Sequence, residues 1–221
     1  MMLVGSPNDW HGFIDSQIPS ILKMVVETWD SLPAPCCDAL EDDVTEAFCV
    51  ALRRSRDRCE LPFSIHIQLV ELEPAEGEDQ GRMDIVFSPP APREDIYFCL
   101  ECKRLNVRSA DGSVRPYFSE YIVHGMLRFI RGQYGKIAKH GGMAAYVLNG
   151  DIDSAIAGIQ SNIIAYEGEL LLASSTTLGR SSFLPQDNRL RETVHTRVGH
   201  SKILLHHLFL AGDPESSFRS K

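Results

Sequence analysis

Two apolar stretches carry most of the information in this chain: GRMDIVF at residues 81–87 and IYFCLECK at residues 96–103. Each is typical of a β-strand, because β-branched and aromatic residues dominate it. Side chains alternate between the two faces of a strand, so Glu101 and Lys103 project to one side of the second stretch. Pairing of the two strands as a hairpin would bring Asp84 alongside them. We therefore expect two carboxylates and a lysine to meet at this place.

These three side chains suit phosphodiester chemistry. Mg²⁺ prefers oxygen ligands, keeps several waters and completes its shell with substrate phosphate, so Asp84 and Glu101 are predicted metal ligands, with Mn²⁺ as a substitute for Mg²⁺. Lys103 lies close to two acids and should stay protonated, able to stabilise charge on the attacking group or on the phosphate. The alternative is a salt bridge on the surface of a hairpin.

The pair Met83-Asp84 with Glu101-Cys102-Lys103 resembles the PD-(D/E)XK nuclease superfamily, with Met83 in place of the proline. The resemblance covers residues 36–150, roughly one domain. It implies a restriction-endonuclease-like fold and a Mg²⁺-dependent endonuclease that hydrolyses phosphodiesters, DNA being favoured over RNA. It also implies the backbone carbonyl of Cys102 as a further metal ligand.

A helix is expected over residues 38–58, with an apolar stripe formed by Leu40, Val44, Ala47, Phe48 and Ala51. At 100° per residue Glu41 falls inside that stripe, whereas Glu46 falls on the opposite face with Cys49 and Arg53. The family contributes an acid from its first helix to the metal site, so the resemblance assigns this catalytic role to Glu41. The alternative is that Glu41 only stabilises the first turn through the helix dipole.

The remaining pattern predicts helices at 17–29, 117–139 and 152–166, and strands at 63–72, 95–105, 143–148, 170–173 and 203–210. Gly125, Gly132 and Gly135 are expected to weaken or split the second of these helices. This order predicts an α/β (α+β) fold with a restriction-endonuclease-like core, in which helices flank a central mixed β-sheet of about four to five strands. We divide the chain into an N-terminal helical extension (1–35), a nuclease-like domain (36–211) and a flexible tail (212–221).

The net charge of −8 argues against a general nucleic-acid coat, but the distribution is uneven. Between Glu101 and His140 eight basic residues face three acidic ones. Arg104, Arg128 and Arg131 are therefore predicted to contact a nucleic-acid backbone. The alternative for each of them is a solvated helix face.

Histidines gather near the C-terminal end. His195 could act as a base, with Arg197 as a phosphate partner, but we favour satisfied structural histidines. His206 and His207 should point to opposite faces of a strand, so they cannot chelate a metal together. Six cysteines without the spacing of a small secreted scaffold, and no apolar run of membrane-spanning length, predict a cytoplasmic protein with no membrane partner. Cys99 and Cys102 are expected to be buried small residues.

We therefore expect a metal-dependent nuclease, by analogy the effector of a bacterial defence or restriction system. Cutting both strands with one active site is awkward, so a homodimer or partner protein subunits are expected. Two alternatives stay open: a catalytically silent interaction subunit that kept the fold, and a ribonuclease that uses the same site.

Overall fold

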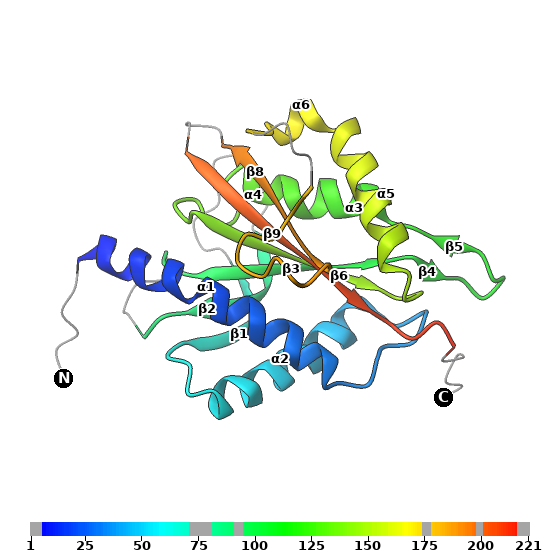
Figure 1. The fold of residues 1–221 in the computed structure, drawn as a ribbon, viewed down its shortest axis with the longest axis horizontal. Coiled ribbons are helices and arrows are strands. Elements are labelled where there is room, and N and C mark those ends of the chain that lie inside the picture. The colour runs from blue at the N-terminus through cyan, green and yellow to red at the C-terminus, as the bar shows by residue number, and fades with distance from the viewer. Residues whose placement is uncertain (1–5, 71–80, 91–94, 174–177, 198–200, 216–221) are drawn as a thin grey trace.

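The computed structural model describes residues 6–70, 81–90, 95–173, 178–197 and 201–215. A seven-stranded mixed sheet lies between two layers of helices (Figure 1). Its strands, in spatial order, are β1 (Ser64–Val70), β2 (Arg82–Ser88), β3 (Phe98–Leu105), β6 (His140–Val147), β9 (Lys202–Ala211), β8 (Leu190–Thr196) and β7 (Gly179–Arg180). β6 runs parallel to both β3 and β9, and the other neighbours are antiparallel. The predicted combination of helices with a mixed sheet is confirmed.

The helices cover both faces of the sheet (Figure 1). One layer consists of α1 (Pro7–Asp30) and α2 (Glu41–Arg58). The other consists of α3 (Phe118–Tyr121), the π-helical turn η1 (Ile122–Met126), α4 (Leu127–Ile130), α5 (Ile152–Ala165) and α6 (Glu167–Leu170). A separate hairpin of β4 (Val107–Arg108) and β5 (Val114–Arg115) continues from the end of β3. Each layer encloses its own apolar core against the sheet.

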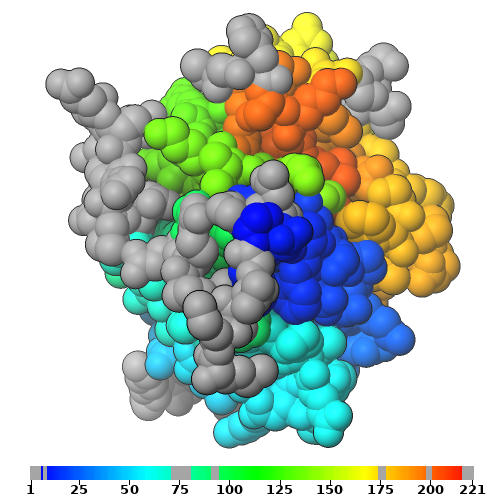
Figure 2. Space-filling view, turned by 90° about the vertical axis from the view of Figure 1, so that its left-hand side faces the viewer, coloured from blue at the N-terminus to red at the C-terminus, as the bar shows by residue number. Residues whose placement is uncertain are grey.

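Helix α1 is an integral part of the first core. It begins ten residues before the predicted 17–29 helix, where the backbone N–H of Ser6 donates to Asp9 Oδ2 at 2.7 Å. At its other end the Trp29 ring stacks on Tyr146 of β6 at 5.2 Å, and its Nε1 donates to the carbonyl of Ala211 at 3.0 Å. The stretch set apart as an extension thus packs directly on the sheet. In Figure 2 this helix, in blue, lies between the cyan residues of α2 and β1 and the green and orange residues of the later strands.

The sheet is larger than the predicted four to five strands, because β7 and β8 extend it beyond β9. β8 escapes prediction because two of its buried side chains are polar, Thr193 and His195. The Thr193 hydroxyl lies 2.6 Å from His195 Nε2 and 2.8 Å from His207 Nε2. Hydrogen bonds therefore satisfy these groups inside the core, where a hydrophobic pattern would look for apolar residues.

Two further expectations are wrong. The helix predicted over residues 117–139 ends at Ile130, because Gly132 takes a left-handed φ of +77° just past the helix end. The strand predicted at 170–173 is replaced by α6 and a single bridge between Leu172 and His195. Residues 71–72 of the predicted strand 63–72 and residues 216–221 of the predicted tail lie outside the described residues.

The apolar stripe of α2 also differs from expectation by about one residue. Its buried face is formed by Thr45, Phe48, Cys49, Leu52 and Ser55. Cys49 is therefore buried rather than on the outer face with Glu46, and Ala47 is exposed. Glu41 keeps its place on the inward face, one turn before Thr45.

The expectation for Cys99 and Cys102 is confirmed. Cys99 and Cys102 are buried on opposite faces of β3, in different cores. Among the described residues, none of the helices has the length and apolar character needed to span a membrane.

Candidate active site

The candidate site lies where β2 separates from β3. Pairing between the two strands runs from Phe87 with Phe98 to Ile85 with Leu100 and then stops. On the other side of β2, the ladder with β1 omits Asp84 and the residue opposite it, Gln68, which has a left-handed φ of +53°. In these described strands Asp84 therefore sits at a break in both ladders, and sparsely populated backbone conformations of this kind often accompany functional sites.

Side-chain carboxylates take over the edge of β3 that β2 leaves. The backbone N–H of Cys102 donates to Asp84 Oδ2 at 2.7 Å. Two residues further on, the backbone N–H of Arg104 donates to Glu41 Oε2 at 2.9 Å. Asp84 and Glu41 thus act as substitutes for a neighbouring strand, and each is held with one oxygen toward β3.

Glu101 and Lys103 project from the same face of β3, as expected. The Glu101 side chain is only 1% exposed, and its Oε1 lies 2.8 Å from Lys103 Nζ. Lys103 Nζ also lies 3.2 Å from Glu41 Oε1 and donates to the carbonyl of Cys102 at 2.8 Å. The structure therefore brings together Glu41, Asp84, Glu101 and Lys103, from three separate elements, and we call this group the carboxylate–lysine site.

Burial and charge act in opposite directions on these groups. Burial raises the pKa of Glu101 to about 7, although the nearby charges of Lys103 and Arg128 oppose this. Burial likewise raises the pKa of Asp84, against the effect of Lys103 and of the Cys102 N–H. Burial alone would lower the pKa of Lys103, but the charges of Glu101, Glu41 and Asp84 outweigh it and raise that pKa. Lys103 is therefore a cation at neutral pH, beside acids that burial makes reluctant to ionise.

Arg128 and Tyr134 complete the surroundings of Glu101. Arg128 Nη1 donates to Glu101 Oε1 at 2.9 Å and to the Tyr134 hydroxyl at 2.6 Å. The Tyr134 hydroxyl in turn donates to the backbone carbonyl of Arg82 at 2.8 Å. Tyr134 is the site residue that sequence reasoning missed, since it follows the helix in a turn with no catalytic spacing. The Tyr134 ring packs against Gly81, where a Cβ would lie 2.5 Å from Tyr134 Cε1. This contact could not be predicted from the sequence.

The three arginines predicted to contact nucleic acid each have a different partner. Arg128 points to Glu101, whereas Arg131 lies past the end of α4, 3.6 Å from Glu169, with its side chain 55% exposed. The end of α4 at Ile130 lies between the two arginines. Arg104 donates from Nη1 to the carbonyl of Ala39 at 2.8 Å, next to α2.

The histidines are buried in hydrogen-bond networks away from the carboxylate–lysine site. His195 Nδ1 lies 2.7 Å from the carbonyl of Leu170, and burial lowers its pKa to about 4. His207 Nδ1 lies 2.8 Å from the Tyr121 hydroxyl, on the opposite face of β9 from His206. His206 Nε2 lies 3.0 Å from His140 Nδ1. These contacts agree with the structural role that we favoured.

Arg197 is also buried and serves the backbone. It donates to the carbonyls of Gly135 at 2.5 Å, Lys136 at 2.7 Å and Ala138 at 2.6 Å. It therefore holds the segment that follows α4, which contains Tyr134, rather than facing solvent as a phosphate partner would.

Two carboxylate oxygens of the carboxylate–lysine site remain available for a divalent metal. Glu101 Oε2 is buried without a hydrogen-bond partner in the part of the chain that the structure describes. Asp84 uses Oδ2 for the Cys102 N–H, which leaves Oδ1 for another partner. No group of three or more His, Cys, Asp or Glu side chains among the described residues is arranged to hold a metal. Glu101 Oε2 and Asp84 Oδ1 would match an ion such as Mg²⁺, which needs only one or two protein carboxylates beside water and phosphate.

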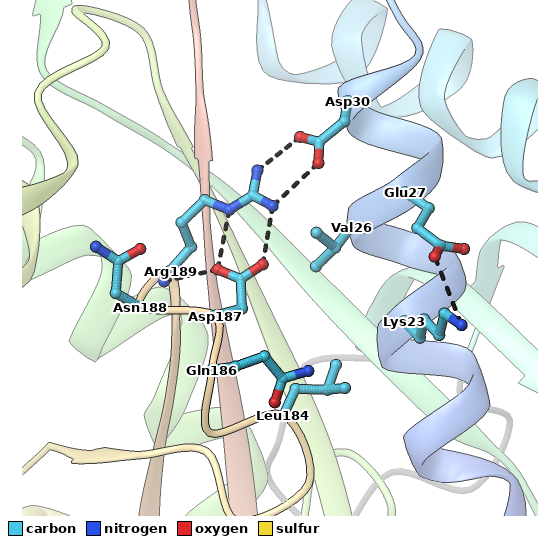
Figure 3. Close-up of a pocket in the computed structure, with 9 residues that line it drawn as sticks. All are labelled: Lys23, Val26, Glu27, Asp30, Leu184, Gln186, Asp187, Asn188 and Arg189. Atoms are coloured by element: carbon cyan, nitrogen blue, oxygen red, sulfur yellow. Dashed lines mark hydrogen bonds and ion pairs between the residues drawn. The ribbon is translucent and has the colours of Figure 1, made fainter.

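A hollow of about 480 Å³ lies elsewhere, between α1 and residues 184–189 (Figure 3). Arg189 bridges it, with its guanidinium 2.6 Å and 3.0 Å from the two oxygens of Asp30 and 2.8 Å from Asp187. The hollow shares no residue with the carboxylate–lysine site. We interpret these ion pairs as a brace between α1 and the segment before β8.

Comparisons with protein-family models, curated proteins and solved structures found no match to this chain.

Proposed function

We propose that the chain is a metal-dependent nuclease that hydrolyses phosphodiester bonds, with DNA as the favoured substrate. The observation that carries the proposal is the convergence of Asp84, Glu101, Lys103 and Glu41 from β2, β3 and α2. A surface salt bridge would not require one of these acids to be 1% exposed with an oxygen that has no hydrogen-bond partner among the described residues. An acid buried in this way costs stability, which favours a chemical role for it.

The residues of the site would divide the work. Asp84 Oδ1, Glu101 Oε2 and the Cys102 carbonyl would hold the metal, and Glu41 would support Lys103. Bound there, Mg²⁺ would supply Lewis-acid chemistry, which makes water more acidic and offsets charge on the phosphate. Lys103 would stabilise the negative charge that develops during attack, because its ammonium group is protonated and already fixed by three oxygens.

A second function is favoured by one observation. Glu101 already has two cationic partners, so the same contacts would suit a catalytically silent interaction subunit that keeps Lys103 and Arg128 only for stability. The two proposals differ in what a metal does. A nuclease must bind Mg²⁺ or Mn²⁺ at these carboxylates, and a silent subunit has no reason to.

The test uses the whole chain and several substrates. Supercoiled plasmid, single-stranded DNA and RNA are incubated with Mg²⁺, Mn²⁺ or EDTA, for the wild type and for Asp84→Asn, Glu101→Gln and Lys103→Met. Glu46→Gln is the matched control, because Glu46 is an exposed acid on the outer side of α2. We expect metal-dependent cleavage by the wild type and the control, and loss of cleavage in the three site variants with unchanged circular dichroism.

The choice of substrate and the assignment are read from the same assay. Cleavage of RNA alone would replace DNA by RNA as the substrate. Equal cleavage by the wild type and Asp84→Asn would refute the assignment of the site. A wild type whose melting temperature does not respond to either metal, and which cuts nothing, would favour the silent subunit.

A further inference from the structure

Arg128 occupies a position at Glu101 that the proposed function leaves unexplained. Its Nη1 lies 2.9 Å from Glu101 Oε1, the same oxygen that lies 2.8 Å from Lys103 Nζ. Two cations therefore share one carboxylate oxygen, while the other oxygen, Oε2, has no hydrogen-bond partner in the described residues. A divalent metal approaching Oε2 would meet Arg128 at the far side of the same carboxylate.

Tyr134 fixes Arg128 in this position. Its hydroxyl accepts from Arg128 Nη1 at 2.6 Å and donates to the carbonyl of Arg82 at 2.8 Å, two residues before Asp84. Burial, followed by the charge of Glu101, raises the pKa of Tyr134, so its hydroxyl keeps its proton. The Tyr134 ring is held against Gly81, where there is no room for a side chain. The contact between Arg128 and Glu101 is thus braced from β2.

The charges explain what this bracing does. The described site contains three carboxylates, Glu41, Asp84 and Glu101, and two cations, Lys103 and Arg128. Without Arg128 the excess of negative charge would be larger, and a dication would be attracted more strongly. Arg128 therefore opposes metal binding in the free protein, while it orders the Glu101 carboxylate that would receive the metal.

We propose that Arg128 and Tyr134 form a clamp on Glu101 that weakens the binding of a divalent metal and holds this carboxylate in the orientation that catalysis needs. This inference rests on the proposed function. Arg128 is then a positioning residue that acts through Glu101, not a contact to the nucleic-acid backbone. When an anionic phosphate is present together with the metal, the positive charge of Arg128 would no longer weaken metal binding, because the negative charge of the phosphate balances it.

The test measures metal binding without catalysis. Free Mn²⁺ is quantified by electron paramagnetic resonance at pH 8.5, above the value of about 7 to which burial raises the pKa of Glu101, for the wild type, Arg128→Met, Arg128→Lys and Tyr134→Phe. Arg131→Met is the matched control, because Arg131 is the neighbouring arginine and pairs with Glu169 instead. We expect Arg128→Met to bind Mn²⁺ on the order of tenfold more tightly, since a cation close to the dication has gone. Tyr134→Phe should show a smaller increase, and Arg128→Lys and Arg131→Met should resemble the wild type.

Kinetics on plasmid DNA provide the second measurement. The clamp predicts that Arg128→Met lowers kcat with little change in KM, because Glu101 loses its fixed orientation while DNA binding is untouched. A backbone contact predicts instead a raised KM and a salt dependence flatter by about one unit of slope. A purely structural role predicts weaker Mn²⁺ binding together with a lower melting temperature.

The possible results distinguish a failure of the clamp from a failure of the proposed nuclease function. A wild type that binds no Mn²⁺ would overturn both. A wild type that binds Mn²⁺, with equal or weaker binding in Arg128→Met, would overturn the clamp alone. If Arg128→Met does not fold, Tyr134→Phe decides, because it keeps the ring against Gly81 and removes only the hydroxyl: unchanged Mn²⁺ affinity in that variant would refute the clamp.

Discussion

Replacing Glu101 by glutamine should change the stability of the metal-free protein in a way that depends on pH. Glutamine keeps the shape of the side chain and remains neutral at every pH. Burial raises the pKa of Glu101 from 4.5 to about 7. Between these two pH values the native protein holds a proton on Glu101 that the unfolded chain has released. The free energy of unfolding of the wild type therefore falls as the pH rises through this window, and the glutamine variant lacks this loss.

The magnitude follows from the size of the shift. One pKa unit corresponds to about 1.4 kcal/mol, so the shift to about 7 amounts to about 3 kcal/mol. At pH 5 most of this penalty is absent, and at pH 8 it is fully present. The free energy of unfolding of Glu101→Gln, relative to the wild type, should thus increase by about 2–3 kcal/mol between pH 5 and pH 8, because part of the penalty is already present at pH 5. For a chain of this length that equals a relative change in melting temperature of about 4–12 °C.

The assay is urea unfolding in EDTA at both pH values, followed by circular dichroism, for the wild type, Glu101→Gln and Glu46→Gln. Comparing each variant with the wild type at the same pH removes the contributions of other titrating groups. Glu46→Gln makes the same change of charge at an exposed position and serves as the control for the charge change alone. A Glu101→Gln variant that becomes less stable relative to the wild type as the pH rises would refute the reasoning. It would mean that the ion pairs with Lys103 and Arg128 outweigh the cost of burying the charge.

Two other substitutions test further parts of the structure. Glu41→Gln should keep the hydrogen bond from the Arg104 N–H, because an amide oxygen also accepts. It should still weaken metal-dependent cleavage, because the negative charge beside Lys103 is lost. Glu46→Gln should leave the cleavage rate unchanged when both variants are assayed at the same Mg²⁺ concentration. If Glu41→Gln and Glu46→Gln change the cleavage rate equally, Glu41 only stabilises the first turn of α2 through the helix dipole. Arg197→Met should lower the free energy of unfolding by about 2–4 kcal/mol in urea titrations, because the carbonyls of Gly135, Lys136 and Ala138 lose their donor. No loss of stability would mean that water replaces the guanidinium.

The part of the site that lies on two strands could be predicted because strand periodicity is simple. Alternation alone places Glu101 and Lys103 on one face of β3, and a hairpin brings β2 beside it. The inward position of Glu41 was also within reach, although the assumed stripe of α2 was displaced. Cys49 and Thr45 are buried where Ala47 and Leu40 had been expected, because the helix packs through a face that contains small polar residues.

The rest of the site depends on backbone features that leave little trace in a single sequence. Arg128 lies within α4 and pairs with Glu101, whereas Arg131 follows the last residue of α4 and pairs with Glu169, although regular helical spacing groups the two arginines together. Tyr134 reaches the site only because α4 ends at Ile130 and Arg197 holds the following turn. β8 was missed for a related reason, since hydrogen bonds among Thr193, His195 and His207 replace apolar contacts in the core.

The break between β2 and β3 determines how the two candidate functions differ. A strand edge that loses its neighbour exposes backbone N–H groups, which must find other acceptors. Here the Asp84 carboxylate accepts a hydrogen bond from the Cys102 N–H, and the Glu41 carboxylate accepts one from the Arg104 N–H. One oxygen of each carboxylate therefore stabilises the fold whether or not the protein is an enzyme. Asparagine or glutamine could serve equally well at that task, because an amide oxygen also accepts. The charges of Glu41 and Glu101 also balance Lys103, so they would be useful to a silent scaffold as well. What a silent scaffold does not need is Glu101 Oε2, which is buried and has no hydrogen-bond partner among the described residues, since both cations use Oε1. This oxygen is therefore the strongest physical argument for the metal.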